Sequence, residues 1–326
     1  MSDATLTTRE KMTSLTLGLA LTAVAIEVVF RLWAPATGGF NNEVDEYPTN
    51  PRGYFDEVRT EQGHAVYGVP LTLKPGTHER LGEPLRPELP VRFLGLGDSQ
   101  GMGQGVRFQD TAYEQMSELL ETDEWQGRAL NASVRGYDLV DIVARAKNEL
   151  AGNRDFDAVI YTLVLDDFGL EPVTATNPSN SPSAAVRFFA HAWAQWDLSE
   201  RTTAAYLSSF EGERLDRGIK QLVALNAIAN DHQAPLVIAI MPLLYRFDRY
   251  PFGPIHIALQ QACETHNLAC IDLLPALASH DASAMWVHPT DHHPNETAHR
   301  LMAETMAAYV LGAKILPPQK NLQSGK

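Results

Sequence analysis

The chain has 326 residues, 44% of them hydrophobic and 20% charged, which excludes a disordered or fibrous protein and predicts one sizeable packed core. The formal net charge is −14, and so acidic a surface repels phosphate backbones, which argues against a nucleic-acid partner. Two cysteines, Cys263 and Cys270, are too few for a disulfide scaffold or a multi-cysteine zinc protein, and the sequence leaves open whether they form a disulfide or stay two buried thiols.

An apolar segment over residues 13–33 is the first notable element of the chain. A membrane-spanning helix needs roughly 20 mostly apolar residues, so residues 13–34 are long enough to form a transmembrane anchor after an N-terminal tail of residues 1–12. Only Glu27 and Arg31 interrupt the segment near its end, and their i,i+4 spacing lets them pair on one helix face near the interface.

Two other interpretations of this segment stay open. In a signal peptide, Arg9 and Lys11 would form the basic start and residues 34–36 (Ala-Pro-Ala) the cleavage site. In an amphipathic core helix the segment would need a polar face, yet it is apolar on nearly all sides. The basic residues on the two flanks are nearly balanced, so the simplest orientation exports the one large acidic domain to the periplasm or the cell exterior.

Residues 35–90 carry much Gly, Pro and Asn, which predicts a connector with short strands and turns. A regular alternation of apolar strands and helices follows over residues 91–313, and residues 314–326 form a tail. Strands are expected at 91–96, 128–132, 158–165, 235–241 and 270–273, and helices at 109–121, 137–150, 214–231, 254–266 and 296–310. Nearly all-apolar strands alternating with helices predict a parallel sheet covered on both faces, hence an α/β domain with three layers.

Residues 173–213 depart from this alternation. They begin with a Pro- and Ser-containing loop and continue with an aromatic-rich stretch, which predicts an inserted helical segment. The sequence leaves open whether the insertion covers the site as a lid, faces a membrane, or adds packing to the sheet.

Two residues follow expected strands at the carboxyl edge of the sheet, where open α/β folds bind their ligands. Ser99, in the Gly-Asp-Ser turn after the first strand, is presented as a nucleophile, with backbone N–H groups nearby that can stabilise an oxyanion. The alternative is a plain turn and helix cap. Gly136, after the second strand, allows close backbone approach to a ligand, or is a turn glycine.

A third group of polar residues lies near the C-terminus, where His288, Asp291, His292 and His293 precede a helix. A His with a nearby carboxylate is the general base that activates a serine. Pro294 fits the first turn of that helix, which leaves His293 in the preceding loop. A zinc site is the alternative, although the spacing does not place two His on one helix face.

Together these motifs resemble the SGNH/GDSL hydrolase family over about residues 91–310. The resemblance assigns Ser99 as nucleophile, Gly136 as an oxyanion-hole donor, His293 as base and Asp291 as its partner. Many members have the Asp three residues before the His, where this chain has Thr290. The membrane-anchored bacterial branch is more similar, because it often has the shorter D-x-H-P-N spacing, an apolar N-terminal helix ending in Glu and Arg, and a stretch like the NPRGY at residues 50–54.

One departure from the family pattern concerns the oxyanion hole. The family's third block supplies an Asn whose side-chain amide donates to the oxyanion, and here Asp166 stands at that place. An ionised carboxylate accepts hydrogen bonds and does not donate them. The expected hole therefore consists of Ser99, Gly136 and Asp166. Three alternatives stay open: Asp166 is protonated, the hole relies on the backbone at Ser99 and Gly136, or the activity is altered.

The sequence thus predicts a flavodoxin-like three-layer α/β/α domain behind an N-terminal transmembrane helix, acting as a serine esterase or acyl hydrolase through an acyl-enzyme on Ser99. The expected substrate is an acyl ester, with O-acyl groups of a glycan or lipid as candidates, and no cofactor or metal is expected. An O-acyltransferase with the same triad and a non-catalytic SGNH-fold binding protein are the alternatives.

Overall fold

The structure is a computed structural model that describes residues 7–36, 64–66, 69–73, 80–122, 125–169, 182–186, 189–190, 201, 203–208, 210–288 and 291–317. The chain divides into two compact units, Met1–Glu46 with Pro172–Ala204, and Tyr47–Glu171 with Ala205–Lys326. The NPRGY stretch, most of the expected connector, the outer part of both expected tails and much of the insertion lie outside the described residues.

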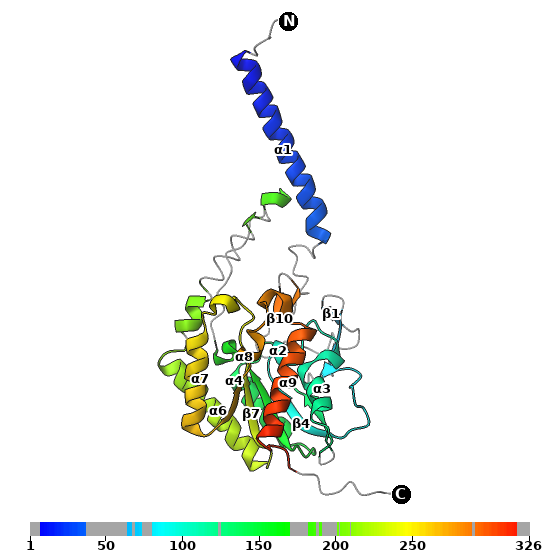
Figure 1. Ribbon diagram of the computed structural model, residues 1–326, viewed down its shortest axis with the longest axis vertical. Helices are drawn as coiled ribbons and strands as arrows, with labels where there is room; N and C mark the ends of the chain where they lie inside the picture. The colour runs from blue at the N-terminus through cyan, green and yellow to red at the C-terminus, as the bar shows by residue number, and fades with distance from the viewer. Residues whose placement is uncertain are drawn as a thin grey trace. The chain divides into compact units, whose positions relative to one another are not determined.

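The larger unit is organised around a five-stranded parallel sheet with the order β5-β4-β6-β7-β8. Figure 1 labels β4 and β7 of this sheet. Its strands are β4 (Val91–Leu96), β5 (Arg128–Asn131), β6 (Ala158–Leu163), β7 (Leu236–Ile240) and β8 (Ala269–Asp272). In chain order this is 2-1-3-4-5, the flavodoxin-like order, so the expected fold class is confirmed. Each strand lies within two residues of its expected bounds.

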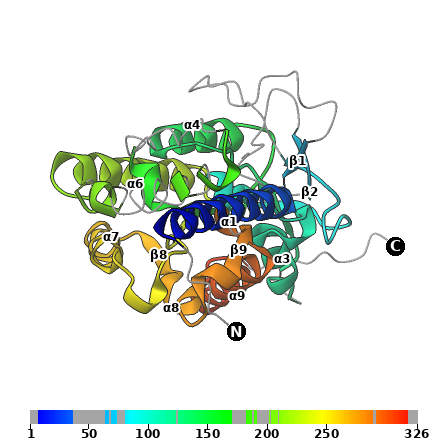
Figure 2. The ribbon, with the colours of Figure 1, turned by 90° about the horizontal axis from the view of Figure 1, so that it is seen from above.

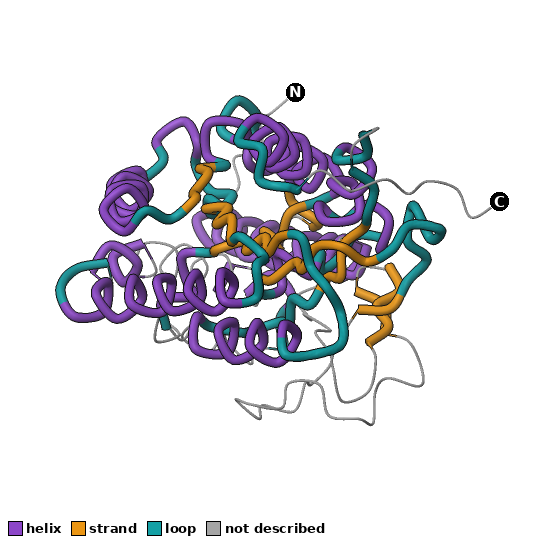
Figure 3. The backbone as a smooth tube through the Cα atoms, turned by 90° about the horizontal axis from the view of Figure 1, so that it is seen from below, coloured by secondary structure: helices purple, strands orange, loops and turns teal. Residues whose placement is uncertain are grey.

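Helices cover both faces of this sheet. They are α3 (Ala112–Leu119), α4 (Leu139–Leu150), α6 (Glu213–Asp231), α7 (Gly253–His266), the short α8 (Leu274–Leu277) and α9 (Glu296–Gly312). Helices α4, α6 and α7 contribute to one buried cluster, and α3, α8 and α9 to the other. Figure 2 shows α4 and α6 on the side opposite α3 and α9, and Figure 3 shows strands between the helical layers.

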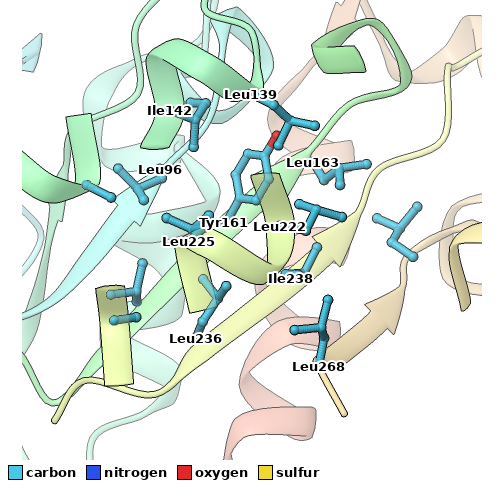
Figure 4. Packing of buried hydrophobic residues seen from close by; sticks show 14 of the residues in the cluster. Leu96, Leu139, Ile142, Tyr161, Leu163, Leu222, Leu225, Leu236, Ile238 and Leu268 are labelled. Carbon is cyan, nitrogen blue, oxygen red and sulfur yellow. The ribbon is translucent and has the colours of Figure 1, made fainter. Parts of the chain in front are cut away.

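Alternation along the strands sends side chains to the two layers in turn. In β4, Leu94 and Leu96 belong to the cluster with α4 and α6, while Phe93 belongs to the cluster with α3 and α9. Tyr161, from the neighbouring β6, packs in the first of these clusters, seen closely in Figure 4. Gly95 leaves room for an aromatic ring, because a Cβ there would lie 2.7 Å from the Tyr113 ring.

Two smaller antiparallel sheets flank the larger one in sequence. β1 (His64–Val66), β2 (Val69–Leu73) and β3 (Arg80–Leu81) pair in that order within the expected connector, which agrees with its predicted short strands. β9 (Trp286–His288) pairs with β10 (Asp291–Pro294). The expectation that His293 lies in a loop is therefore wrong, because backbone pairing with β9 extends strand structure to Pro294 and Asn295 caps α9.

The smaller unit contains α1 (Thr8–Ala36), so the expected N-terminal helix is confirmed. Residues Met12–Leu32 are long and apolar enough to cross a membrane, with a mean hydropathy of 1.9. Within the smaller unit their large side chains are exposed, as expected for an anchor and not for a core helix. In the insertion, residues 184–186, 189–190 and 203–208 are helical, in agreement with its predicted helical character.

The two cysteines form a disulfide between α7 and β8. Cys263 and Cys270 are bonded with their Cα atoms 6.1 Å apart. The pair left open by the sequence is therefore a disulfide and not two thiols.

Candidate active site

Ser99 is presented at the carboxyl end of β4 by a tight turn. Asp98 caps the short helix α2 (Ser99–Met102), because its Oδ1 accepts a hydrogen bond from the Gln100 N–H at 2.8 Å. Gly97 makes the turn close-packed: a Cβ there would lie 3.2 Å from the Cα of Gly101. The turn thus fixes the direction of the Ser99 hydroxyl.

The strand β10 brings His293 to this serine across 194 residues of chain. His293 Nε2 lies 2.8 Å from Ser99 Oγ. On the other side of the ring, Oδ1 of Asp291 contacts Nδ1 and also accepts the His293 N–H at 3.0 Å. An Asp on Nδ1 favours the tautomer with the proton on that nitrogen, which leaves Nε2 free to accept the serine proton. Ser99, His293 and Asp291 therefore meet in the arrangement that the sequence predicts.

Gln104 is a neighbour of this group that the sequence analysis missed. Its buried side chain places Nε2 at 3.4 Å from Asp291 Oδ2 and at 3.5 Å from His293 Nδ1. The amide lies on the side of the imidazole away from Ser99, where it limits how the Asp291 carboxylate turns. No motif marks Gln104, because its contacts join residues 187 and 189 positions apart in the chain.

Arg80, from β3, holds the loop that carries Gln104. The guanidinium is almost completely buried and donates to the backbone carbonyls of Met102, Gly103 and Val106. Burial lowers the pKa of Arg80 to about 10, which still keeps the group charged at neutral pH. A residue outside the expected catalytic segment thus orders the loop beside the site.

His299, further along the same stretch, has a structural role. It is fully buried in α9, and its Nδ1 accepts the backbone N–H of Ala112 at 3.2 Å. The pKa of His299 is lowered to about 3, mainly by burial and secondly by the charge of Arg80. The ring is therefore neutral. It ties α9 to α3 and does not serve as the base.

Three carboxylates gather next to Ser99. One oxygen each of Asp98, Asp166 and Asp167 lies within 4.8 Å of the others. Asp166 and Asp167 belong to the 3₁₀ helix η3 (Leu165–Phe168), which follows β6 at the same edge of the sheet as Ser99. The described residues thus contain one close group of carboxylates, at the place where the sequence resemblance expects an amide donor.

Burial raises the pKa of all three carboxyl groups, and neighbouring carboxylate charges raise it further in Asp166 and Asp167. The pKa of Asp166 is raised to about 7. The main cause is desolvation by the surrounding protein, and the second is the charge of Asp98. The Asp166 side chain still reaches solvent, so water screens part of this effect. Asp167 is buried, and burial and the two neighbouring charges raise its pKa well above the usual range, although it accepts from Tyr161 OH at 2.6 Å and from the Val164 N–H at 2.8 Å.

Gly136 lies in the turn between β5 and α4. Its φ is +74°, in the left-handed region that favours glycine, and the residue is exposed. The turn agrees with the second-block resemblance. Its role as an oxyanion donor stays a prediction.

The three histidines of the C-terminal group make different contacts. His292 stacks on Trp286, with ring centroids 3.9 Å apart and the planes 17° from parallel. His288 pairs with Asp291 through the backbone of β9 and β10. His293 uses both of its ring nitrogens, one toward Asp291 and one toward Ser99.

Comparisons with known proteins give structural similarity alone. No family model and no curated protein match the sequence. Similar solved structures include TesA (15% identity, TM-score 0.46, covering 69% of this chain and 99% of that one). Another is a member of the lipolytic protein G-D-S-L family from Veillonella parvula (16% identity, TM-score 0.42, covering 68% of this chain and 97% of that one). A third is a catalytic mutant of an acetylxylan esterase from Geobacillus stearothermophilus (15% identity, TM-score 0.45, covering 70% of this chain and 97% of that one).

At identities of 15–16% and TM-scores of 0.42–0.46, these structures show similarity of fold alone. The geometry around Ser99 and the flavodoxin-like order of the sheet indicate what the site can do.

Proposed function

We propose that this protein is a serine acyl hydrolase of the SGNH type. Ser99 Oγ attacks the ester carbonyl while His293 Nε2 takes its proton, and His293 then gives that proton to the departing alcohol. Water attacks the acyl-enzyme and passes a proton to His293, which donates it to Ser99 Oγ as the bond between the acyl carbon and Oγ breaks. The carboxylic acid and free Ser99 are thereby released. The observation that carries the proposal is the 2.8 Å separation between His293 Nε2 and Ser99 Oγ, with Asp291 on the opposite ring nitrogen.

The oxyanion formed in each step needs hydrogen-bond donors. We propose the backbone N–H groups of Ser99 and Gly136, with Asp166 as a third donor when it is protonated. Two observations support Asp166: it follows β6 at the same edge as Ser99, and its pKa is raised to about 7. Protonated carboxylic acids act as such donors when their surroundings disfavour the charged form.

A covalent serine probe tests the nucleophile directly. A fluorophosphonate should label the wild-type protein at Ser99, because the adjacent His293 makes the hydroxyl reactive, and should not label Ser99→Ala. Labelling is read as a mass increase on the tryptic peptide that contains Ser99. A matched control is Ser117→Ala, which alters a buried serine that donates to the Tyr113 carbonyl at 2.9 Å and belongs to no part of the site. Equal labelling of the wild type and Ser99→Ala would remove the nucleophile, and with it the enzyme proposal.

Hydrolysis and acyl transfer use the same residues, so products must separate them. Incubation with acyl esters of increasing chain length, with and without a sugar alcohol, gives free acid in one case and a new ester in the other. The length series also reports which acyl group the site accepts.

We also propose that α1 anchors the protein in a membrane and that the catalytic unit is exported. The apolar stretch Met12–Leu32 supports the anchor. The disulfide between Cys263 and Cys270 supports export, because disulfides persist mainly in oxidising compartments such as the periplasm.

Membrane partition of the full chain tests this anchor. The protein should sediment with membranes after an alkaline wash and keep its uncleaved mass. Leu19→Arg should shift a large share to the soluble fraction, since a central Arg costs about 2.5–3.5 kcal/mol on insertion scales. Lys220→Arg, in the polar part of α6, is the matched control. A shortened protein in the soluble fraction would instead identify a cleaved signal peptide.

A further inference from the structure

Two features of the chain have no part in the chemistry above, the pair Glu27 and Arg31 and the aromatic-rich insertion. In the structure they meet within the smaller unit. The Glu27 carboxylate accepts hydrogen bonds from Ser183 Oγ at 2.7 Å and from the backbone N–H groups of Ala184 at 2.8 Å and Ala185 at 3.2 Å. Glu27 therefore holds the start of the helical turn at 184–186.

Arg31 completes this contact. Its Nε donates to Glu27 Oε1 at 2.7 Å and its Nη2 to the Pro182 carbonyl at 2.8 Å. Beside it, the rings of Phe30 and Phe189 pack edge to face with centroids 5.6 Å apart. Polar and aromatic contacts together join this part of the insertion to the last turns of α1.

The position of Glu27 along α1 explains why such a contact is needed. Glu27 lies five residues before Leu32, the end of the apolar stretch, which is about 7.5 Å along a helix. If α1 spans a bilayer as proposed, the carboxylate lies just inside the hydrocarbon edge, where an unsatisfied charge is expensive. Its hydrogen bonds come from Arg31 and from the insertion, so the insertion must lie at the same depth.

Apolar side chains on the insertion fit that depth. Val186 is 48% exposed and Phe189 is 61% exposed. On α1, Val24 and Val28 are exposed to a similar degree. Phe189 also contacts Phe30 of α1, and exposed apolar groups beside a candidate spanning helix are typical of contact with a lipid phase.

We propose that residues 182–186 and 189–190 belong to a second membrane-contacting element, held to α1 by Glu27 and Arg31, with Val186 and Phe189 against lipid acyl chains. The inference rests on the proposed anchoring by α1. Of the three roles left open for the insertion, this part of it faces the membrane. Glu27 and Arg31 are then positioning residues that hold this element against α1.

A fluorescent probe at the insertion tests the proposal. Full-length Val186→Cys is labelled with an environment-sensitive maleimide, since both native cysteines are bonded to each other and do not react. In phosphatidylcholine–phosphatidylglycerol vesicles its emission should shift to the blue and be quenched by nitroxide-labelled lipids. The matched control is Val140→Cys on α4, which is 60% exposed and should keep the emission of a probe in water.

Further variants separate this inference from the anchor. Leu21→Cys on α1 should be quenched in the same vesicles. Quenching at Leu21 with water-like emission at Val186 would overturn the inference and leave the anchor intact, while water-like emission at both would overturn the anchor.

The role of Glu27 has its own comparison. Glu27→Leu should abolish quenching at Val186 and leave it at Leu21, whereas Glu27→Gln, which keeps an acceptor oxygen, should retain most of it. Unchanged quenching at Val186 in Glu27→Leu would show that Glu27 does not hold the insertion.

Discussion

Ser99→Ala and His293→Ala should each lower kcat for ester hydrolysis by about 10⁶-fold, and the double variant should be little worse than either. The reason is that the serine is activated only by the base at 2.8 Å, so losing either partner removes the same step. Asp291→Asn should cost less, about 10⁴-fold, because the imidazole stays in place but in the wrong tautomer. Single-turnover kinetics on a short acyl ester measures all four variants.

His292→Ala and His288→Ala serve as matched controls in that series. His292 stacks on Trp286 and His288 lies in β9, so each should retain most of the activity. If both controls were inactive and a chelator abolished wild-type turnover, the histidines would bind a metal and the serine mechanism would be wrong. Additive losses in the double variant would also contradict it, because the two residues would then act separately.

Asp166→Asn should change the pH profile of the enzyme on its alkaline side. The pKa of Asp166 is raised to about 7, so the carboxyl is neutral and can donate below that pH, and it ionises above it. Wild-type kcat should therefore fall as the pH rises through about 7. Asn donates at every pH, so the variant should lose this fall and exceed the wild type at pH 9 by up to about 10²-fold, the worth of one oxyanion donor.

Thermal unfolding tests the raised pKa of the Asp166 carboxyl independently of catalysis. A pKa raised above the unfolded value of about 3.9 means that the folded state binds the proton more tightly, so wild-type stability falls as the pH rises from about 4 to about 7. Asp166→Asn should raise Tm at pH 8 and change it little near pH 4. Asp231→Asn, at the exposed end of α6, controls for the loss of one surface charge.

Two outcomes would contradict this role. Identical pH profiles for the wild type and Asp166→Asn would show that Asp166 does not face the oxyanion, so the third-block alignment would be wrong. If a chelator altered the wild-type profile and not that of the variant, the carboxylates of Asp98, Asp166 and Asp167 would bind a cation in place of a proton.

Local patterns predict those parts of this protein that depend on neighbouring residues. The apolar runs identify the sheet strands, most clearly β6 and β7, in which every residue is buried. Ser99, Asp291 and His293 are predictable because the turn after a strand and the D-x-H-P-N motif carry local signals. The pairing of His293 with Ser99 itself comes from the resemblance, since no local rule joins residues so far apart in the chain.

Other parts of the site depend on contacts between distant segments and leave no local signal. Arg80 lies in the two-residue strand β3 and Gln104 in a turn. Their importance lies in the carbonyls and side chains that they contact. The pairing of β9 with β10 is short and includes a register shift, so its residues do not show a clear strand period. The disulfide is similar: spacing alone does not tell a bonded pair from two thiols.

The three carbonyls bound by Arg80 set a limit on how short an active fragment can be. A recombinant domain beginning at residue 91, where the regular alternation starts, would lack this guanidinium, and the carbonyls of Met102, Gly103 and Val106 would lose their donors. Such a fragment could retain the sheet and still lose the geometry around Gln104. Crystallisation and screening fragments should therefore begin before β1 at His64, so that the antiparallel sheet delivering Arg80 is complete.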